Sequence, residues 1–173
     1  MPAVVEISEA LIRGYVTRAV TEVFKTMTRR TPTFTGLMED SQGRPRLETD
    51  PARPQVVGSV GFIGEVNGLV YLHFDLTFAR LCACQMLGLS EKELDAVGPE
   101  VINDAMGELT NMTAGGFKNG LCDVGYPCKL TIPSILRGTG ICVQPIRSVV
   151  RHVYQFECAG HRLWADIQIK ADE

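Results

Sequence analysis

The sequence predicts an α+β domain in which helices pack on one face of a largely antiparallel sheet. Residues 6–27 repeat apolar side chains at helical spacing, and two β-rich runs meet at Asn67-Gly68. From residue 128 onward, apolar and polar residues alternate as they do in half-buried strands. The chain has 173 residues, the size of one ordinary domain, so we expect residues 1–173 to share a single core.

The first 55 residues predict a helix, a short strand and a long loop. In residues 6–27 the apolar positions recur at i, i+4 and i+7 in a wide stripe, which is typical of a core helix, and Ser8 is a suitable N-cap. A short strand is expected at 33–38. Residues 39–55 carry three prolines and many charges. Because such a composition buries little apolar surface, we expect an exposed loop there.

The middle of the chain predicts a β-hairpin followed by a helix. The β-rich runs of residues 56–76 are separated by Asn67-Gly68, the strongest short-range hairpin signal. The first run is rich in glycine, but a phosphate-binding loop requires a helix directly after the glycines, and here a second strand follows. Thr77 is the expected cap of a helix over residues 78–87.

The last part of the chain predicts another helix and several strands. Ser90 and Glu93 have the spacing of a capping box within a polar connection. Pro99 is expected to open a helix, since its missing N–H is not needed in the first turn. Alternating patterns and turn signals indicate strands at 128–133, 140–147, 153–158 and 162–170.

Charge and hydropathy exclude two classes of function. The formal net charge is −3, from 17 basic and 20 acidic residues, and no extended basic cluster is present. A nucleic-acid binder normally needs a basic face, so nucleic acid is not an expected partner. No stretch approaches the ~20 apolar residues of a membrane span, and the start of the chain does not resemble a signal peptide. We therefore expect a cytoplasmic protein that does not contact a membrane.

The cysteines do not predict a metal site. In a reducing cytosol we expect them to be free thiols that serve mostly as small core residues. A metal-binding redox sensor built on Cys82 and Cys84 is the weakest functional hypothesis, because the chain has no CxxC pair and these two side chains would point to different faces of a helix. The six cysteines are Cys82, Cys84, Cys122, Cys128, Cys142 and Cys158.

A line of polar residues on the helix that follows Pro99 is the strongest functional signal. Asp104, Glu108 and Asn111 stand at i, i+4 and i+7, so they share one stripe of a helix. Most polar stripes are only solvated faces. Here, however, the two carboxylates repel each other by about 0.2–0.5 kcal/mol, and aspartate and asparagine are weak helix formers. A sequence that accepts such costs in one place is often preserving a site.

These residues resemble a known signature. The pattern Asp104-x3-Glu108-x2-Asn111, followed 22 positions later by Pro133, is similar to that of the CheC/CheX/FliY family of response-regulator phosphatases. The segments "VGSVGFIGEVNGLVYLHFD", "GELTNMTAGGFKNGL" and "CKLTIPSILRGTG" resemble the hairpin, the active-site helix and the following strand and loop of that family. The proline spacing is one residue shorter than in the family signature. The resemblance spans roughly residues 56–145.

The resemblance implies hydrolysis of the aspartyl phosphate of a CheY-like response regulator. In that reading Glu108 and Asn111 are catalytic: Asn111 orients the attacking water, and Glu108 pairs with a lysine of the regulator. Asp104, Gly115 and Pro133 support the site or the docking. The protein needs no cofactor of its own, because the Mg²⁺ belongs to the phosphorylated regulator.

Two alternatives remain beside this reading. Glu100 and Asn103 form a rival Glu-x2-Asn pair, but Ala96 stands where an acidic residue or a serine would be required and the downstream spacing is missing. A single copy of the signature resembles the CheX branch, which implies a homodimer formed by joining sheets.

The alternative function is a non-catalytic module that docks a response regulator or another chemotaxis protein.

Overall fold

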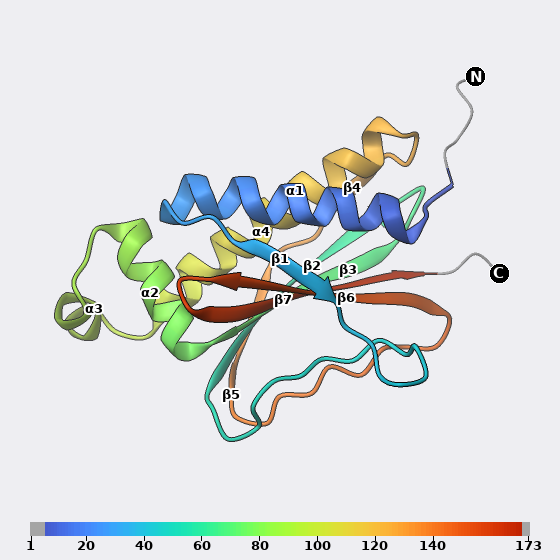
Figure 1. Cartoon of the computed structure of the whole chain (residues 1–173). Coiled ribbons are helices and arrows are strands. Elements are labelled where there is room, and N and C mark those ends of the chain that lie inside the picture. Colours follow the sequence, from blue (N-terminus) through green and yellow to red (C-terminus); the bar gives the residue numbers. More distant parts are fainter. Residues whose placement is uncertain (1–5, 171–173) are drawn as a thin grey trace.

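The computed structural model describes residues 6–170 and has one seven-stranded antiparallel sheet with helices on one face (Figure 1). This arrangement confirms the predicted α+β class. The strand order is β1-β6-β7-β3-β2-β4, and β5 also pairs with β2, further along the same edge. The elements are α1 (Glu9–Thr28), β1 (Thr33–Leu37), β2 (Gln55–Gly64), β3 (Gly68–Asp75), α2 (Leu76–Leu87), α3 (Glu91–Val97), α4 (Glu100–Asp123), β4 (Cys128–Leu130), β5 (Ser134–Gly138), β6 (Val149–Cys158) and β7 (His161–Lys170).

The two long helices α1 and α4 lie antiparallel on the same face of the sheet (Figure 1). Their contact depends on two glycines of α4. A Cβ atom added at Gly116 would lie 3.0 Å from the Cβ of Ala19, and one added at Gly120 would lie 2.6 Å from the ring of Tyr15. The glycines that weaken α4 as an isolated helix therefore allow it to pack closely against α1.

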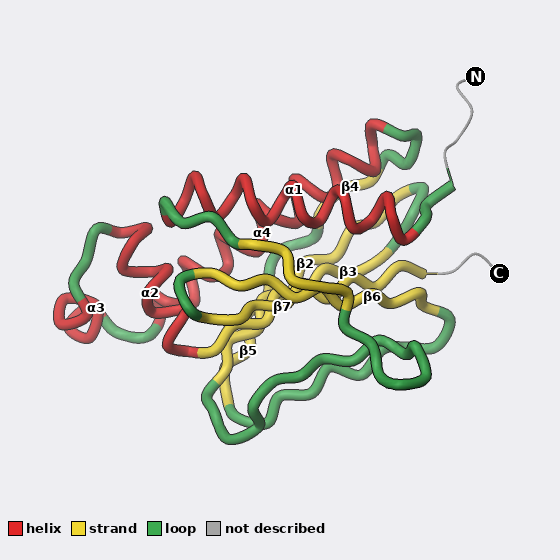
Figure 2. The backbone as a smooth tube through the Cα atoms, in the orientation of Figure 1, coloured by secondary structure: helices red, strands yellow, loops and turns green. Residues whose placement is uncertain are grey.

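The other face of the sheet is covered by irregular chain, mainly residues 38–54 and 139–148 (Figures 1 and 2). Beneath these segments lies a buried polar cluster. The carboxylate of Asp166 is fully buried and accepts hydrogen bonds from Nε (3.0 Å) and Nη2 (2.7 Å) of Arg151. His73 is also fully buried, and its burial lowers its pKa to about 4, so its ring is neutral at pH 7.

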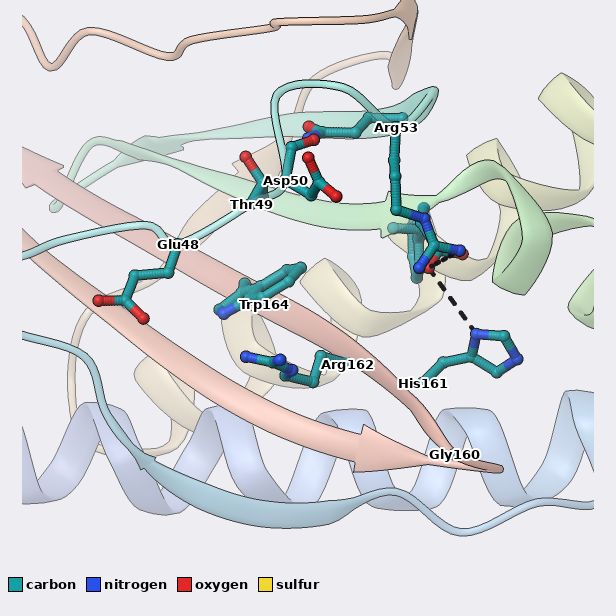
Figure 3. A pocket seen from close by; sticks show the side chains of 11 residues that line it. Glu48, Thr49, Asp50, Arg53, Gly160, His161, Arg162 and Trp164 are labelled. Atoms are coloured by element: carbon teal, nitrogen blue, oxygen red, sulfur yellow. Dashed lines mark hydrogen bonds and ion pairs between the residues drawn. The ribbon is translucent and has the colours of Figure 1, made fainter.

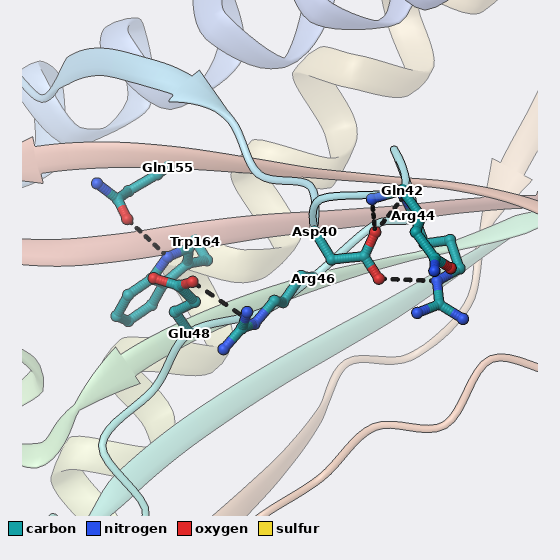
Figure 4. Close-up of polar contacts among 7 residues, drawn as sticks. All are labelled: Asp40, Gln42, Arg44, Arg46, Glu48, Gln155 and Trp164. Atoms are coloured by element: carbon teal, nitrogen blue, oxygen red, sulfur yellow. Dashed lines mark hydrogen bonds and ion pairs between the residues drawn. The ribbon is translucent and has the colours of Figure 1, made fainter.

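Local polar contacts give residues 39–54 a defined path (Figure 4). Asp40 accepts hydrogen bonds from the backbone N–H groups of Gln42 (2.8 Å) and Arg44 (3.0 Å), and from Nε of Arg44 (2.7 Å). The backbone N–H of Arg44 is the main cause of a lowered pKa for Asp40. Most residues of this segment are exposed, so it is ordered by hydrogen bonds rather than by burial.

A second set of contacts ties this loop to the ends of two elements (Figure 3). Nη2 of Arg53 lies 3.3 Å from the Asp75 carboxylate, and Nδ1 of His161 lies 3.8 Å from the same oxygen. Asp75 is also the N-cap of α2, because it accepts a hydrogen bond from the backbone N–H of Phe78 at 2.7 Å. Asp75 therefore joins the loop to the start of α2 and to the start of β7.

Two predicted helix features differ from the structure. Helix α2 begins one residue before Thr77 and is capped by Asp75, since the aspartate carboxylate is placed to accept the Phe78 N–H. The polar connection after α2 contains the short helix α3, which the predicted capping box of Ser90 and Glu93 begins.

The strand predicted at residues 140–147 is wrong. Those residues are irregular, because Gly140 has a positive φ of 66° and Pro145 cannot donate to a strand ladder. The chain instead forms β5 at residues 134–138, where β2 offers an open edge for pairing. The predicted hairpin of β2 and β3 is confirmed, although its turn lies at residues 65–67 and Gly68 already belongs to β3. A turn at Ala159-Gly160 joins β6 to β7.

Candidate functional site

Helix α4 presents the predicted polar line on its outer side. Its inner side is buried against the sheet and α1, and includes Ile102, Leu109 and Phe117. Because these apolar positions recur at helical spacing, Asp104 and Glu108 lie on the exposed side and Asn111 is half-buried at the edge. The amphipathic pattern of the sequence alone therefore turns these polar side chains outward.

The segment between β4 and β5 brings Pro133 to this line. Thr131 anchors the segment to β2: its N–H donates to the carbonyl of Gly61 at 2.8 Å, and its Oγ1 accepts from the N–H of Gly61 at 2.9 Å. The result is a shallow depression of about 310 Å³ between α4 and β5. It is lined by Asn103, Asp104, Gly107, Glu108, Asn111, Pro133 and Ile135.

The structure thus brings together four of the five predicted site residues. Asp104, Glu108, Asn111 and Pro133 share one depression, although they come from two segments of the chain. Gly115 does not line it. This glycine lies one turn beyond Asn111, where an added Cβ would make an ordinary contact with Leu130 at 3.8 Å.

Two lining residues were not found from the sequence. Gly107 lines the depression between Asp104 and Glu108, where it has no side chain to fill the space. Helical spacing places it on the same face of α4, so the sequence could have predicted it. Ile135 belongs to β5, whose existence the local pattern did not reveal, so its place beside α4 had no signal in the sequence.

The polar side chains of the line have no partners inside the protein. Within residues 6–170, Asp104, Glu108 and Asn111 make no side-chain hydrogen bond or ion pair. They are therefore available to an external group. On the surface of α1, by contrast, Glu9 and Arg13 at i, i+4 form an ion pair at 2.9 Å.

The rival pair Glu100 and Asn103 is placed differently. Asn103 lines the depression, but its Oδ1 accepts from Nη1 of Arg137 at 3.5 Å. The same nitrogen of Arg137 donates to the carbonyl of Pro99 at 3.1 Å. Glu100 is exposed at the start of α4 and does not line the depression. The rival pair therefore does not place both of its side chains in the depression.

A glycine sets how deeply α4 sits on the sheet at this point. A Cβ atom at Gly58 of β2 would overlap the side chain of Thr110, which is fully buried directly before Asn111. Oγ1 of Thr110 donates to the carbonyl of Met106 at 2.7 Å, so this side chain is held within its own helix. Gly58 therefore lets the part of α4 that carries Asn111 approach β2 closely.

The described residues give little support to a metal-centred reading. Between residues 6 and 170, no three His, Cys, Asp or Glu side chains are grouped as metal ligands. Cys82 and Cys84 are buried, and burial raises the pKa of both thiols, which keeps them protonated and unreactive. In the same part of the chain, no helix has the length and hydropathy needed to cross a membrane.

Fold and site together define a protein of the CheC/CheX/FliY type, as the resemblance implied. A family model described as "Chemotaxis phosphatase CheX" matches residues 56–157, which is more than half of the chain. The chain belongs to the CheX family. No curated protein sequence matches it.

Solved structures share its fold. CheX from Vibrio vulnificus superposes with a TM-score of 0.76 at 22% identity, covering 95% of this chain and 100% of that one. CheX from Desulfovibrio desulfuricans gives 0.75 at 21% identity, with 92% and 99% covered. A complex of CheX with CheY, BeF3 and Mg²⁺ from Borrelia burgdorferi gives 0.67 at 19% identity, with 92% and 97% covered. At such identities the likeness is one of fold.

Proposed function

We propose that this protein hydrolyses the aspartyl phosphate of a CheY-like response regulator. The observation that carries the proposal is the line Asp104, Glu108 and Asn111, gathered with Pro133 and left without internal partners. Membership of the CheX family supports it. A CheX of similar fold also forms a complex with CheY, BeF3 and Mg²⁺ in Borrelia burgdorferi, which supports a CheY-like partner for this chain.

In this proposal Asn111 positions the attacking water. Its carboxamide is neutral, so it can enter a site crowded with phosphate oxygens without repulsion, and its oxygen can accept a hydrogen bond from the water. The water oxygen attacks phosphorus as the bond to the aspartyl oxygen breaks, which leaves a free carboxylate on the regulator and inorganic phosphate. Such a reaction depends chiefly on positioning and on charge compensation already in place.

In this proposal Glu108 supplies charge compensation and helps to fix the position of the helix on its partner. It lies one helical turn before Asn111, about 4.5 Å along the axis, and on the same face. A carboxylate there can pair with a lysine beside the regulator's phosphoryl group and so fix the register of the helix on its partner. The Mg²⁺ is part of the phosphorylated regulator, so α4 needs no metal ligand of its own. Asp104 supports docking one further turn away.

The assembly and location of the protein are proposed on the same basis. The sheet has open edges at β1 and along β4 and β5, and joining two sheets at such an edge would give the homodimer that the CheX resemblance implies. A response regulator is a cytoplasmic partner, so the proposed site of action is the cytoplasm.

The test follows the loss of acyl phosphate from the response regulators of the same genome. We expect the native protein to accelerate loss from one of them, and Asn111→Ala to bind that regulator while its acceleration falls about 10²-fold. Thr21→Ala, on the outer face of α1, is the matched control and should behave as the native protein. If the native protein binds a regulator without accelerating phosphate loss, the alternative of a docking module holds instead.

A further inference from the structure

A cation lies near each end of the outer face of α4: Lys118 of the helix itself at one end, and Arg137 of β5 at the other. The stripe that begins with Asp104, Glu108 and Asn111 continues through Gly115 to Lys118, at alternating steps of four and three residues. Asp104 and Lys118 are 14 positions apart, so their backbone positions are separated by about 21 Å along the axis. The stripe is therefore acidic in its first half, neutral in the middle and basic at its end.

Arg137 stands at the opposite end, near the start of α4. It lies two residues after Ile135 on β5, so both side chains leave the same face of the sheet, toward the helix. The donation from its Nη1 to the carbonyl of Pro99, at 3.1 Å, fixes the guanidinium beside the first turn. Arg137 is exposed, and one planar fork can bind another partner while keeping this bond.

Neither cation is neutralised within the protein. Among residues 6–170, no ion pair includes Arg137 or Lys118, whereas Arg13, Arg44, Arg80 and Arg151 are all paired with carboxylates. Other cations of the described chain, among them Arg18, Lys92 and Arg147, are also unpaired, so what sets Arg137 and Lys118 apart is their position on either side of the acidic line. Along the face, Arg137 and the exposed Glu100 stand at the start of α4, two carboxylates and a neutral middle follow, and Lys118 lies at the end.

We infer that Arg137 and Lys118 dock a response regulator through acidic side chains on both sides of its acyl phosphate. This inference rests on the proposed function. The lysine and Mg²⁺ at the centre of such a partner face the carboxylates of Asp104 and Glu108, and acidic side chains at its rim face the two cations. The opposite charge order on the partner would then be complementary along the whole face.

The two cations also counter a repulsion that the proposed reaction would otherwise meet. The line itself is acidic, and so is a phosphorylated surface. Until the carboxylates of the line reach the partner's lysine and Mg²⁺, they are repelled by its phosphoryl group and acidic rim, and the two cations offset that repulsion. Charges at the rim of an interface act mostly on the rate of association, and their effect weakens as salt screens them. Arg137 and Lys118 are thus docking residues that do not touch the reacting atoms.

The test measures association kinetics by stopped flow, using the regulator held in its activated form with beryllofluoride and Mg²⁺. Arg137→Glu and Lys118→Glu are each expected to lower the association rate constant about three- to tenfold at low salt, and less at high salt. Arg137→Lys keeps the charge and should retain most of the rate. Arg162→Glu, on the opposite face of the sheet, is the control and should leave the rate unchanged.

Turnover and folding separate the possible outcomes. The charge variants should raise the KM for the phosphorylated regulator by about the factor by which they slow association. Thermal unfolding should show that Lys118→Glu is folded like the native protein. Association that is unchanged in both charge reversals would overturn the docking role alone. Native protein that associates with no regulator would reject the proposed function and the docking role together. Native protein that associates but does not hydrolyse would reject the phosphatase, and a loss of association on charge reversal would still support the docking role.

Discussion

The helices α1 and α4 lie in comparable places on the sheet, but the outer surfaces that they present differ in how their polar residues are paired. Both lie on the same face of the sheet, and beside the outer side of each runs a short edge strand that follows a proline: β1 after Pro32, and β5 after Pro133. In each case one apolar residue of that strand, Phe34 or Ile135, lines a shallow depression against the helix. The scaffold thus offers two similar positions for a surface site.

The polar residues of the two helices are used differently. On α1, Arg13 pairs with Glu9 at 2.9 Å and lies over the ring of Phe34 at 5.9 Å, while Glu9 also accepts from the hydroxyl of Tyr154 at 3.2 Å. On α4, Asp104 and Glu108 face solvent without partners within the described chain. Glu22 on α1 also has no partner in the described chain, so the comparison teaches that unpaired polar residues become informative when they gather with a second segment in one depression, as the line of α4 does with Pro133.

The largest expected difference between the two helices concerns activity. Glu108→Gln should lower kcat/KM for the phosphorylated regulator about 10²-fold, a loss of about 2.7 kcal/mol in transition-state stabilisation, because the partner's lysine loses its counter-charge. Glu22→Gln makes the same chemical change on the outer side of α1 and should leave kcat/KM unchanged. Equal effects of the two substitutions would show that the unpaired line of α4 has no special role.

A glycine of β2 provides the next test, through the depth at which α4 is held. Gly58→Ala places a methyl group on the side chain of Thr110, so we expect a loss of about 1–3 kcal/mol in the free energy of unfolding from overpacking. The displaced helix should also lower activity, because Thr110 adjoins Asn111. Denaturant unfolding measures the first effect. The double substitution Gly58→Ala with Thr110→Ala removes the hydroxyl that lies nearest the added methyl group, and should recover part of the stability.

Replacing a glycine of α1, Gly14, by alanine is expected to stabilise the protein, the opposite of the effect at Gly58. Nothing lies within 4 Å of a Cβ atom added at Gly14, which is exposed in the interior of the helix. Gly14→Ala should therefore stabilise the protein by about 0.5–1 kcal/mol, since alanine loses less backbone entropy on forming a helix. Thermal unfolding would show this as a higher midpoint. A lower midpoint would mean that this side of α1 is covered in the assembled protein.

Local pattern was enough to find the line on α4, because helical periodicity alone places Asp104, Glu108 and Asn111 on one face. It was also enough to find the hairpin, although the turn lies at residues 65–67 and neither Asn67 nor Gly68 has the positive φ of an Asn-Gly turn. What it could not supply were contacts between distant segments. The strand β5 exists because β2 offers it an edge, and the closeness of Gly58 to Thr110 joins positions 52 residues apart. The place of Arg137 beside Pro99 depends on both.

The smallest expected difference is in the sign of the change in the free energy of unfolding when one carboxylate of each helix is neutralised. Asp104 and Glu108 are like charges at i, i+4 with no partners in the described chain, so Asp104→Asn should stabilise the protein by about 0.2–0.5 kcal/mol. Glu9 has a partner in Arg13 and lies in the first turn of α1, where a negative charge is favourable, so Glu9→Gln should destabilise by about 0.5 kcal/mol. Chemical denaturation at low salt would resolve both changes, and high salt should shrink both. If Asp104→Asn destabilised the protein instead, the carboxylate would have an internal partner, and the contrast between the paired helix and the open helix would fail at that residue.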